Sequence, residues 1–311
     1  MEEKLIIRIS NNFGNQLFMY AAAYAASKKL NKNFFIDNLS SYNSIKNIYT
    51  YALDGLNLSA KNILKDDSFI GLNGNLKRKI LKKIDIFRNK KKFLLEKYDH
   101  NKKTFFNENI LNQKFANKIY MEGYFESEKY FFDYKDEIIK EFTHKNNHKF
   151  INNPYYKLIN DSESVSLCLR QNRHSEKFRN ITSSDSIKSE LFIKEQLKFI
   201  NKAISFFKSK LKNPKFFLWS NNYVDLNKYF NNQNITFVDN ESLHSVDNKI
   251  HLDMFLMTNC KHFAVIPSSF NWWGCWLSKF SNKIVLRPND KHFEHLEIKN
   301  KDYWPNDWLS I

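Results

Sequence analysis

Four polar loops, each expected to follow a short apolar strand, carry side chains able to bind an anion. Arg170 and Arg173 follow the apolar run at residues 165–169, and a guanidinium there can hold a diphosphate through two parallel hydrogen bonds. Ser268 and Ser269 open a predicted helix after another run, an arrangement that binds anions. Taken singly, a strand-end arginine is more often a surface residue, and paired serines are more often a helix cap.

The other two loops contain amide side chains. Residues 11–16 precede an alanine-rich segment, and Gly14 is expected to adopt a backbone conformation there that other residues avoid. Asn15 and Gln16 fall at the N-terminus of the following helix, so capping alone also explains them. Residues 220–222 follow another apolar run.

Strand and helix patterns alternate along the chain and determine where these loops lie. The first half opens with a predicted strand at 5–9, a helix at 16–30 and a strand at 33–37. Steps of three and four predict one long helix through Ile193, Leu197, Ile200, Ile204, Phe207 and Leu211. Further strands are predicted at 165–169, 216–219, 235–238, 263–266 and 284–286, with helices at 252–260 and from 268. This alternation predicts parallel strands with ligands at their C-terminal ends.

The length of the chain favours two domains, because 311 residues lie near the size, roughly 250–300 residues, at which a single core divides. Polar residues at 145–160 suggest a linker. We therefore predict an α/β protein of two Rossmann-like domains facing a cleft, with an N-terminal domain at 1–150 and a C-terminal domain at 151–311.

The scarcity of glycine narrows the ways in which a phosphate can be held. With six glycines, the chain has neither a Gly-x-Gly-x-x-Gly dinucleotide loop nor a phosphate loop ending in Gly-Lys-Ser/Thr. An Asp-x-Asp pair, which commonly chelates Mg²⁺ or Mn²⁺ in nucleotide-sugar enzymes, is also missing. Cationic side chains and helix N-termini are therefore expected to bind any nucleotide, without a metal.

Basic residues exceed acidic ones by 49 to 33, a net charge of +16. Residues 77–103 hold twelve basic and three acidic residues, so more than half of this charge lies in one segment. Leu76, Ile80, Ile84 and Phe87 fall at near-helical spacing, which predicts a basic amphipathic helix in its first half. Codon bias toward Lys, Asn, Ile and Phe explains the charge equally well.

The cysteines and the N-terminus favour a cytoplasmic protein. Cys168, Cys260 and Cys275 each lie in an apolar run, as expected for buried thiols in a reducing compartment. We find neither a secretion signal nor an apolar run near the roughly 20 residues that span a bilayer. The basic segment raises the hypothesis of peripheral contact with the anionic inner face of the plasma membrane.

Taken in order, the loops resemble the α-1,2-fucosyltransferase family (glycosyltransferase family 11-like), which makes Fuc-α-1,2-Gal linkages. The motifs that carry the resemblance lie at 13–18, 123–131, 253–257, 268–277 and 303–308, together with Arg170 after its strand. The Gly-Asn-Gln block at 14–16 and the Trp-Trp-Gly block at 272–274 are the most specific of them.

The resemblance implies a GT-B-like fold and an inverting, metal-independent transfer of L-fucose from GDP-fucose to the 2-hydroxyl of a terminal galactoside, in a bacterial surface glycan or a free oligosaccharide. It implies that Arg170 binds the β-phosphate and stabilises departing GDP, and that Asp253 pairs with guanine. The other donor-binding residues that it implies are Gly14, Asn15, Gln16, Asn172, Arg173, Ser220, Asn221, Ser268, Ser269 and Phe270. By the same resemblance the domain at 1–150 is the acceptor side, with a basic insertion at about 77–103, and the domain at 151–311 binds GDP-fucose.

The loop after the strand at 165–169 departs from the family pattern His-x-Arg-Arg-Gly-Asp. Cys168 stands in place of the usual His, Gln171 in place of the second Arg, and Asn172 with Arg173 in place of Gly-Asp. We expect Arg173 to restore the second cation from a shifted position. The donor preference, the acceptor, the oligomeric state and the general base stay open.

Three other interpretations stay open. The basic composition suggests a nucleic-acid-binding protein, although that class does not explain the four strand-end loops, and we expect no nucleic-acid partner. A fucosyltransferase of other linkage or acceptor is the second. The third is an inactive relative that binds glycans, suggested by the altered arginine loop.

Overall fold

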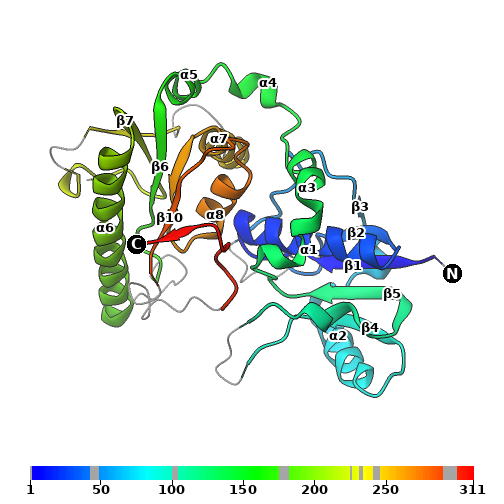
Figure 1. The fold of residues 1–311 in the computed structure, drawn as a ribbon. Helices are drawn as coiled ribbons and strands as arrows, with labels where there is room; N and C mark the ends of the chain where they lie inside the picture. The colour runs from blue at the N-terminus through cyan, green and yellow to red at the C-terminus, as the bar shows by residue number, and fades with distance from the viewer. Residues whose placement is uncertain are drawn as a thin grey trace. The chain divides into compact units, whose positions relative to one another are not determined.

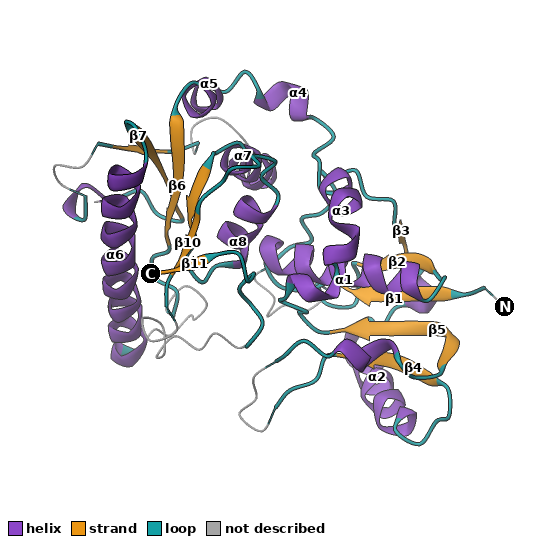
Figure 2. Cartoon of the chain, in the orientation of Figure 1, coloured by secondary structure: helices purple, strands orange, loops and turns teal. Residues whose placement is uncertain are grey.

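The computed structural model describes residues 2–42, 49–99, 104–174, 182–224, 226–230, 234–240, 246–289 and 300–311. It divides into two compact units, Met1–Lys145 with Lys299–Pro305 and Asn146–Ile298 with Asn306–Ile311. The prediction from sequence did not include the return of residues 299–305 to the first unit. Figure 1 colours the chain by residue number, and Figure 2 shows that helices and strands alternate in both units.

The first unit is built on a parallel sheet in the order β3-β2-β1-β5-β4. Its strands are β1 (Lys4–Arg8), β2 (Asn33–Asp37), β3 (Lys61–Asn62), β4 (Lys91–Leu95) and β5 (Phe115–Glu122). Its helices are α1 (Phe13–Lys29), α2 (Gly71–Asp85) and α3 (Lys135–Glu141), with 3-10 turns at Lys65–Asp67, Glu108–Leu111, Glu128–Tyr130 and Phe132–Tyr134. Helix α1 is buried over most of its length because small alanines let it pack closely on β1 and β2. The chain runs outward from β1 through β2 to β3, then crosses to β4 at the opposite edge and returns inward to β5. The switch point of this sheet therefore lies between β1 and β5.

The second unit is built on a parallel sheet in the order β11-β10-β9-β6-β7-β8. Its strands are β6 (Glu163–Leu169), β7 (Pro214–Ser220), β8 (Ile235–Phe237), β9 (His262–Ala264), β10 (Val285–Arg287) and β11 (Leu309–Ser310). Three strands run outward from β6 in chain order, and the next three run outward on the other side, which is the Rossmann order. The switch point therefore lies between β6 and β9.

The helices of the second unit are α4 (Asn147–Phe150), α5 (Pro154–Asn160), α6 (Ser183–Lys210), α7 (Val246–Thr258) and α8 (Ser269–Trp276), with a 3-10 turn at Leu226–Lys228. Helix α6 begins with a capping box between Thr182 and Asp185 and packs on β6 and β7. Its buried face includes Phe192, Phe199, Ile200, Ala203, Ile204 and Phe207, whereas Ile193 and Leu197 of the predicted stripe are only half-buried. The fold class, the long helix and the second-half strands predicted from the sequence are confirmed.

The Trp-Trp-Gly block forms the core of the second unit. Trp272, Trp273 and Trp276 of α8 are buried and contact one another through their rings. A Cβ atom on Gly274 would lie 2.2 Å from Sδ of Met257, so the absence of a side chain lets α8 approach α7 closely. The three cysteines are buried and free, as predicted. None of the helices described is long and apolar enough to cross a membrane.

Candidate functional site

The loops after β6, β7 and β9 meet at the C-terminal edge of the second sheet. Gln171 joins the first two: its backbone N–H donates to Asn221 Oδ1 at 2.7 Å, and Asn221 Nδ2 donates back to its carbonyl at 3.0 Å. Gln171 Nε2 also donates to Ser220 Oγ at 3.3 Å and to the carbonyl of Asn222 at 2.6 Å. Ser220 and Asn221 thus lie beside the arginine loop, and their side chains hold the two strand ends together.

Gln196 of α6 fixes the backbone of Arg170. Its Oε1 accepts from the Arg170 N–H at 2.9 Å, and its Nε2 donates to the Arg170 carbonyl at 2.9 Å. Gln196 is fully buried, so these bonds are shielded from water. Sequence reasoning missed this residue, although it lies four positions after Phe192 and four before Ile200, on the buried stripe of α6. A polar side chain on such a stripe needs a hydrogen-bond partner.

Arg173 spans the switch point between β6 and β9. Its Nη1 donates to the carbonyl of Pro267 at 2.8 Å, and the guanidinium carbon lies 4.9 Å from the ring centroid of Phe192. A planar cation stacked on an aromatic ring is held in one orientation. Asn172, which precedes it, has a φ of 53°, a left-handed conformation that turns the loop. The second arginine therefore lies at the strand ends, and its role as the second cation stays a prediction.

Arg170 and Asp253 both act electrostatically on the thiol of Cys168. Burial raises the pKa of Cys168 to about 12, while the charge of Arg170 lowers it and that of Asp253 raises it further. Both charged side chains therefore lie within electrostatic reach of the end of β6. Asp253 Oδ1 accepts from Asn240 Nδ2 at 2.8 Å, and Asn240 is fully buried after β8.

The loop after β9 leads into α8. Asn271 Oδ1 accepts from the backbone N–H of Ile266 at 2.9 Å, which ties α8 to the strand end. Ser268 is the N-cap residue of α8, but its side chain makes no capping hydrogen bond. Ser269 and Phe270, the first residues of the helix, are half-buried. The loop thus carries a helix N-terminus to the switch point.

Gly14, Asn15 and Gln16 lie in the first unit, in the first turn of α1. The expectation for Gly14 was wrong: the left-handed residue of this loop is Asn11, with a φ of 68°, while Gly14 is helical. The cause is the cap on α1, because Asn12 accepts from the Asn15 N–H and starts the helix before Gly14.

The side chain of Gln16 is hydrogen-bonded to the backbone of the loop after β1 and of the segment at residues 50–52. Its Nε2 donates to the carbonyls of Asn11 at 2.8 Å and Thr50 at 2.7 Å, and its Oε1 accepts from the Ala52 N–H at 2.9 Å. Asn11 Nδ2 in turn donates to the hydroxyl of Tyr124 at 3.1 Å, across the switch point of the first sheet.

A buried carboxylate fixes the backbone that follows β5, next to that switch point. Glu96, which follows β4, accepts from the backbone N–H groups of Tyr124 at 2.7 Å and Phe125 at 3.0 Å. Burial raises the pKa of Glu96 to about 7, although the two hydrogen bonds act against that rise. Gly123 has a φ of 151°, and a Cβ there would lie 2.4 Å from the Cβ of Glu96, so this turn requires glycine. Sequence reasoning placed Gly123 in a motif but did not identify Glu96.

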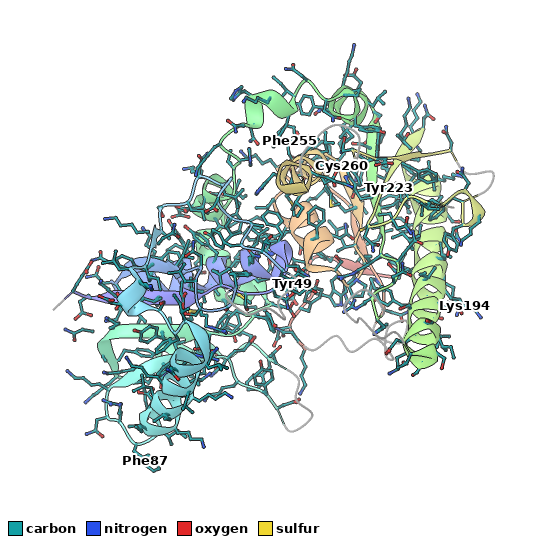
Figure 3. The ribbon with its side chains drawn as sticks, turned by 180° about the vertical axis from the view of Figure 1, so that it is seen from behind. Tyr49, Phe87, Lys194, Tyr223, Phe255 and Cys260 are labelled. Carbon is teal, nitrogen blue, oxygen red and sulfur yellow. The ribbon has the colours of Figure 1, made fainter. Side chains whose placement is uncertain are left out.

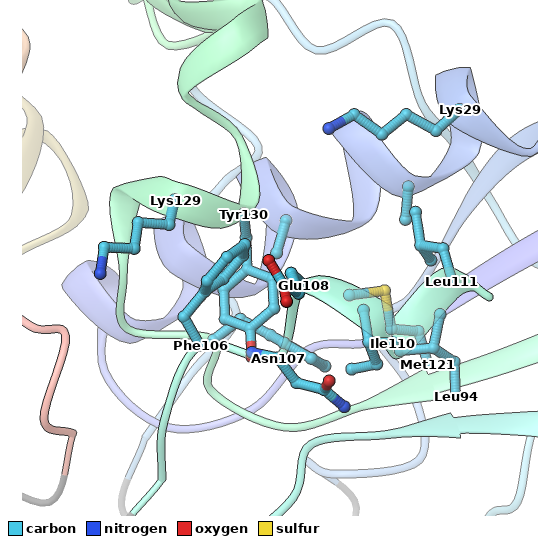
Figure 4. A pocket seen from close by; sticks show the side chains of 13 residues that line it. Lys29, Leu94, Phe106, Asn107, Glu108, Ile110, Leu111, Met121, Lys129 and Tyr130 are labelled. Carbon is cyan, nitrogen blue, oxygen red and sulfur yellow. The ribbon is translucent and has the colours of Figure 1, made fainter.

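A cavity of about 50 Å³ opens in the first unit beside α1 and is lined by side chains that include Phe106, Ile110, Met121 and Tyr130 (Figure 4). Pockets that hold ligands of drug size usually enclose about 300–1,000 Å³. The cavity is thus too small for a nucleotide sugar. Among the residues that the structure describes, no three His, Cys, Asp or Glu side chains converge as a metal site would require.

Two Rossmann-like units with polar loops at the strand ends define a glycosyltransferase fold of the GT-B-like kind. A solved structure, NodZ alpha-1,6-fucosyltransferase soaked with GDP-fucose, matches with a TM-score of 0.50 and 13% identity, covering 89% of this chain and 93% of that one. At this identity, the likeness concerns the fold alone.

The chain belongs to Glycosyl transferase family 11, whose sequence pattern matches residues 4–311. It is 26% identical to the alpha-1,2-colitosyltransferase of Escherichia coli over 311 residues, covering 99% of this chain and 98% of that protein. It is 25% identical to the O-antigen biosynthesis glycosyltransferase WbnK of Escherichia coli, covering 90% and 92%. The resemblance found in the sequence is confirmed at the level of the family, and the chain is a glycosyltransferase.

Proposed function

We propose that this glycosyltransferase moves L-fucose from GDP-fucose to the 2-hydroxyl of a terminal galactoside, with inversion at the anomeric carbon and without a metal. The observation that carries the proposal is the pair of arginines, Arg170 and Arg173, beside the switch point of a Rossmann-ordered sheet. Ligands of such sheets bind at that point. The family membership supports the same reaction class.

In the proposed reaction, the acceptor hydroxyl gives up its proton to a base, and its oxygen forms a bond to the anomeric carbon as the bond from that carbon to the β-phosphate oxygen breaks. GDP leaves with the electron pair and carries more charge on its phosphate as the bond lengthens. A guanidinium beside this phosphate stabilises the transition state more than the ground state. We assign this role to Arg170, whose backbone Gln196 fixes, and a supporting role to Arg173.

We assign the guanine end of the donor to Asp253, because a carboxylate can accept from both N1–H and the exocyclic amino group of guanine. Ser268, Ser269 and Phe270 at the start of α8 are proposed to line the diphosphate and the base. Asn172, Ser220 and Asn221 would shape the loop around them through the bonds that join β6 and β7. Gly14, Asn15 and Gln16 lie in the first unit, and their part in donor binding stays a prediction from the sequence resemblance.

A second candidate donor is the GDP derivative of colitose, which is L-fucose without its 3-hydroxyl. The 26% identity to an alpha-1,2-colitosyltransferase favours it. The loop at Cys168, Gln171 and Asn172 departs from the fucosyltransferase pattern, which is compatible with a changed donor. A bacterial surface polysaccharide would then be the acceptor, in keeping with the O-antigen role in the name of the WbnK relative.

Purified protein, either GDP-fucose or GDP-colitose, and a panel of terminal galactosides test the proposal. We expect a product heavier by one deoxysugar, joined by an α-1,2 linkage in methylation analysis, with unchanged rates in EDTA. Transfer only from GDP-colitose would favour the second candidate. Transfer to another hydroxyl, or GDP release that depends on a divalent metal, would contradict the first.

A further inference from the structure

Helix α2 exposes a continuous row of large apolar side chains. Leu72, Leu76, Ile80 and Ile84 follow one another at steps of four, and Phe87 continues the row beyond the helix; we call these five residues the apolar stripe. All five are exposed, Leu72 to 90% and Phe87 to 87%. Figure 3 shows Phe87 pointing away from the ribbon. An exposed cluster of this kind on a soluble domain usually marks an interaction surface.

The face of α2 that is turned toward its own unit is polar, the reverse of an ordinary surface helix. Arg78 Nη1 and Lys82 Nζ donate to Glu122 Oε2 of β5 at 2.7 and 2.6 Å. Burial favours the neutral form of Glu122, but Lys82 and Arg78 outweigh it and hold its pKa below the usual value.

Two further contacts fix the same face. Asp85 accepts from the backbone N–H groups of Lys92 at 2.8 Å and Phe93 at 3.0 Å. Gly74 approaches the backbone of Phe69 so closely that a Cβ would lie 2.4 Å from its carbonyl carbon. These contacts attach the polar face of α2 to the first unit. The apolar stripe lies on the opposite face of the helix and therefore faces outward.

Lysines border the apolar stripe. Successive helical residues are about 100° apart, so Lys79 and Lys83 fall on one side of the stripe and Lys77 on the other. All three are exposed. A helix with an apolar face bordered by lysines matches an anionic bilayer surface, where the apolar side chains enter the acyl boundary and the ammonium groups reach the head groups.

Other partners fit less well. The core of a protein interface is depleted of lysine, whereas three lysines adjoin this stripe. A nucleic acid would put phosphates against the leucines and isoleucines. We therefore propose that α2 is an interfacial helix that lays the apolar stripe into an anionic lipid surface, which goes beyond the transfer reaction and does not depend on it.

Co-sedimentation with vesicles tests this inference. We expect the wild type to bind vesicles containing about one third phosphatidylglycerol, and to bind pure phosphatidylcholine less well. The triple variant Leu76→Ser, Ile80→Ser, Ile84→Ser should bind at least about tenfold more weakly. A matched control, Ile187→Ser with Leu191→Ser, removes apolar side chains that are also exposed, from α6, and should bind as the wild type does.

A variant that keeps the stripe apolar gives an independent readout. Phe87→Trp should shift its emission to shorter wavelength on addition of anionic vesicles and be quenched by brominated lipid. Replacing Lys77, Lys79 and Lys83 by Gln should weaken binding and flatten its salt dependence. Equal binding by the triple variant and the wild type would overturn the inference, as would an indole emission of Phe87→Trp that vesicles leave unchanged. Capture of a protein partner through the stripe without vesicle binding would overturn it too.

Discussion

Gln196 and Arg170 are joined by two hydrogen bonds of 2.9 Å, one in each direction, between the side-chain amide of the first and the backbone of the second. These bonds hold the end of β6 at Arg170, the residue proposed to bind the β-phosphate. Both bonds are made to the backbone of Arg170 and not to its guanidinium, so we expect Gln196 to act as a positioning residue.

Replacing Gln196 by Leu should reduce kcat by about tenfold or more, because Arg170 then loses its fixed position. The backbone N–H and C=O of the half-buried Arg170 would lose their partner, which should also lower the free energy of unfolding by about 1–3 kcal/mol. Steady-state kinetics and urea unfolding measure the two effects. Gln196→Glu keeps the acceptor and should retain more activity than Gln196→Leu. Equal kcat in the wild type and Gln196→Leu would refute the positioning role.

Glu96 should make the stability of the protein fall as the pH rises. Its pKa of about 7 in the folded protein lies above the value of 4.5 of an exposed glutamate. Its contribution is therefore complete below pH 4.5 and is lost as the pH rises through 7, amounting to about 3 kcal/mol. Urea unfolding from pH 5 to 8 should show wild type losing stability relative to Glu96→Gln. Parallel curves would exclude a raised pKa.

Gly274→Ala should destabilise the second unit by about 1–3 kcal/mol through overpacking, because the added methyl would meet Sδ of Met257. Thermal unfolding measures this effect. Combining it with Met257→Ala should cost less than the sum of the two single changes, since the cavity accepts the methyl. If the losses in the free energy of unfolding of the two single variants simply add in the double variant, residues 257 and 274 are not in tight contact.

Asp253→Asn should weaken GDP binding by about ten- to a hundredfold, because an amide offers one acceptor where the carboxylate offers two. Calorimetric titration with GDP measures the loss, and ADP serves as the control because its base lacks the N1–H donor. If GDP and ADP lose affinity equally, Asp253 does not recognise guanine.

The sequence predicts what local periodicity encodes. The stripe of α6 and the apolar runs of β6 and β7 correspond to observed elements within a few residues. The order of the strands and the pairing of Gln171 with Asn221 depend on contacts between distant parts of the chain. Gln171 and Asn221 are fifty positions apart, and no local sequence pattern indicates that they meet. Spacing predicts that α2 is amphipathic, but not that its apolar side faces outward. That orientation comes from Glu122 and the backbone of β4, which hold the polar side.

The central claim is that Arg170 stabilises GDP as it leaves. Arg170→Ala, assayed with GDP-fucose and a terminal galactoside, tests it most directly, with thermal unfolding to verify the fold and Arg170→Lys to separate charge from bidentate geometry. We predict an unchanged melting temperature and a kcat lower by about a hundredfold or more, partly recovered in Arg170→Lys. A correctly folded Arg170→Ala protein with near-normal turnover would contradict the account.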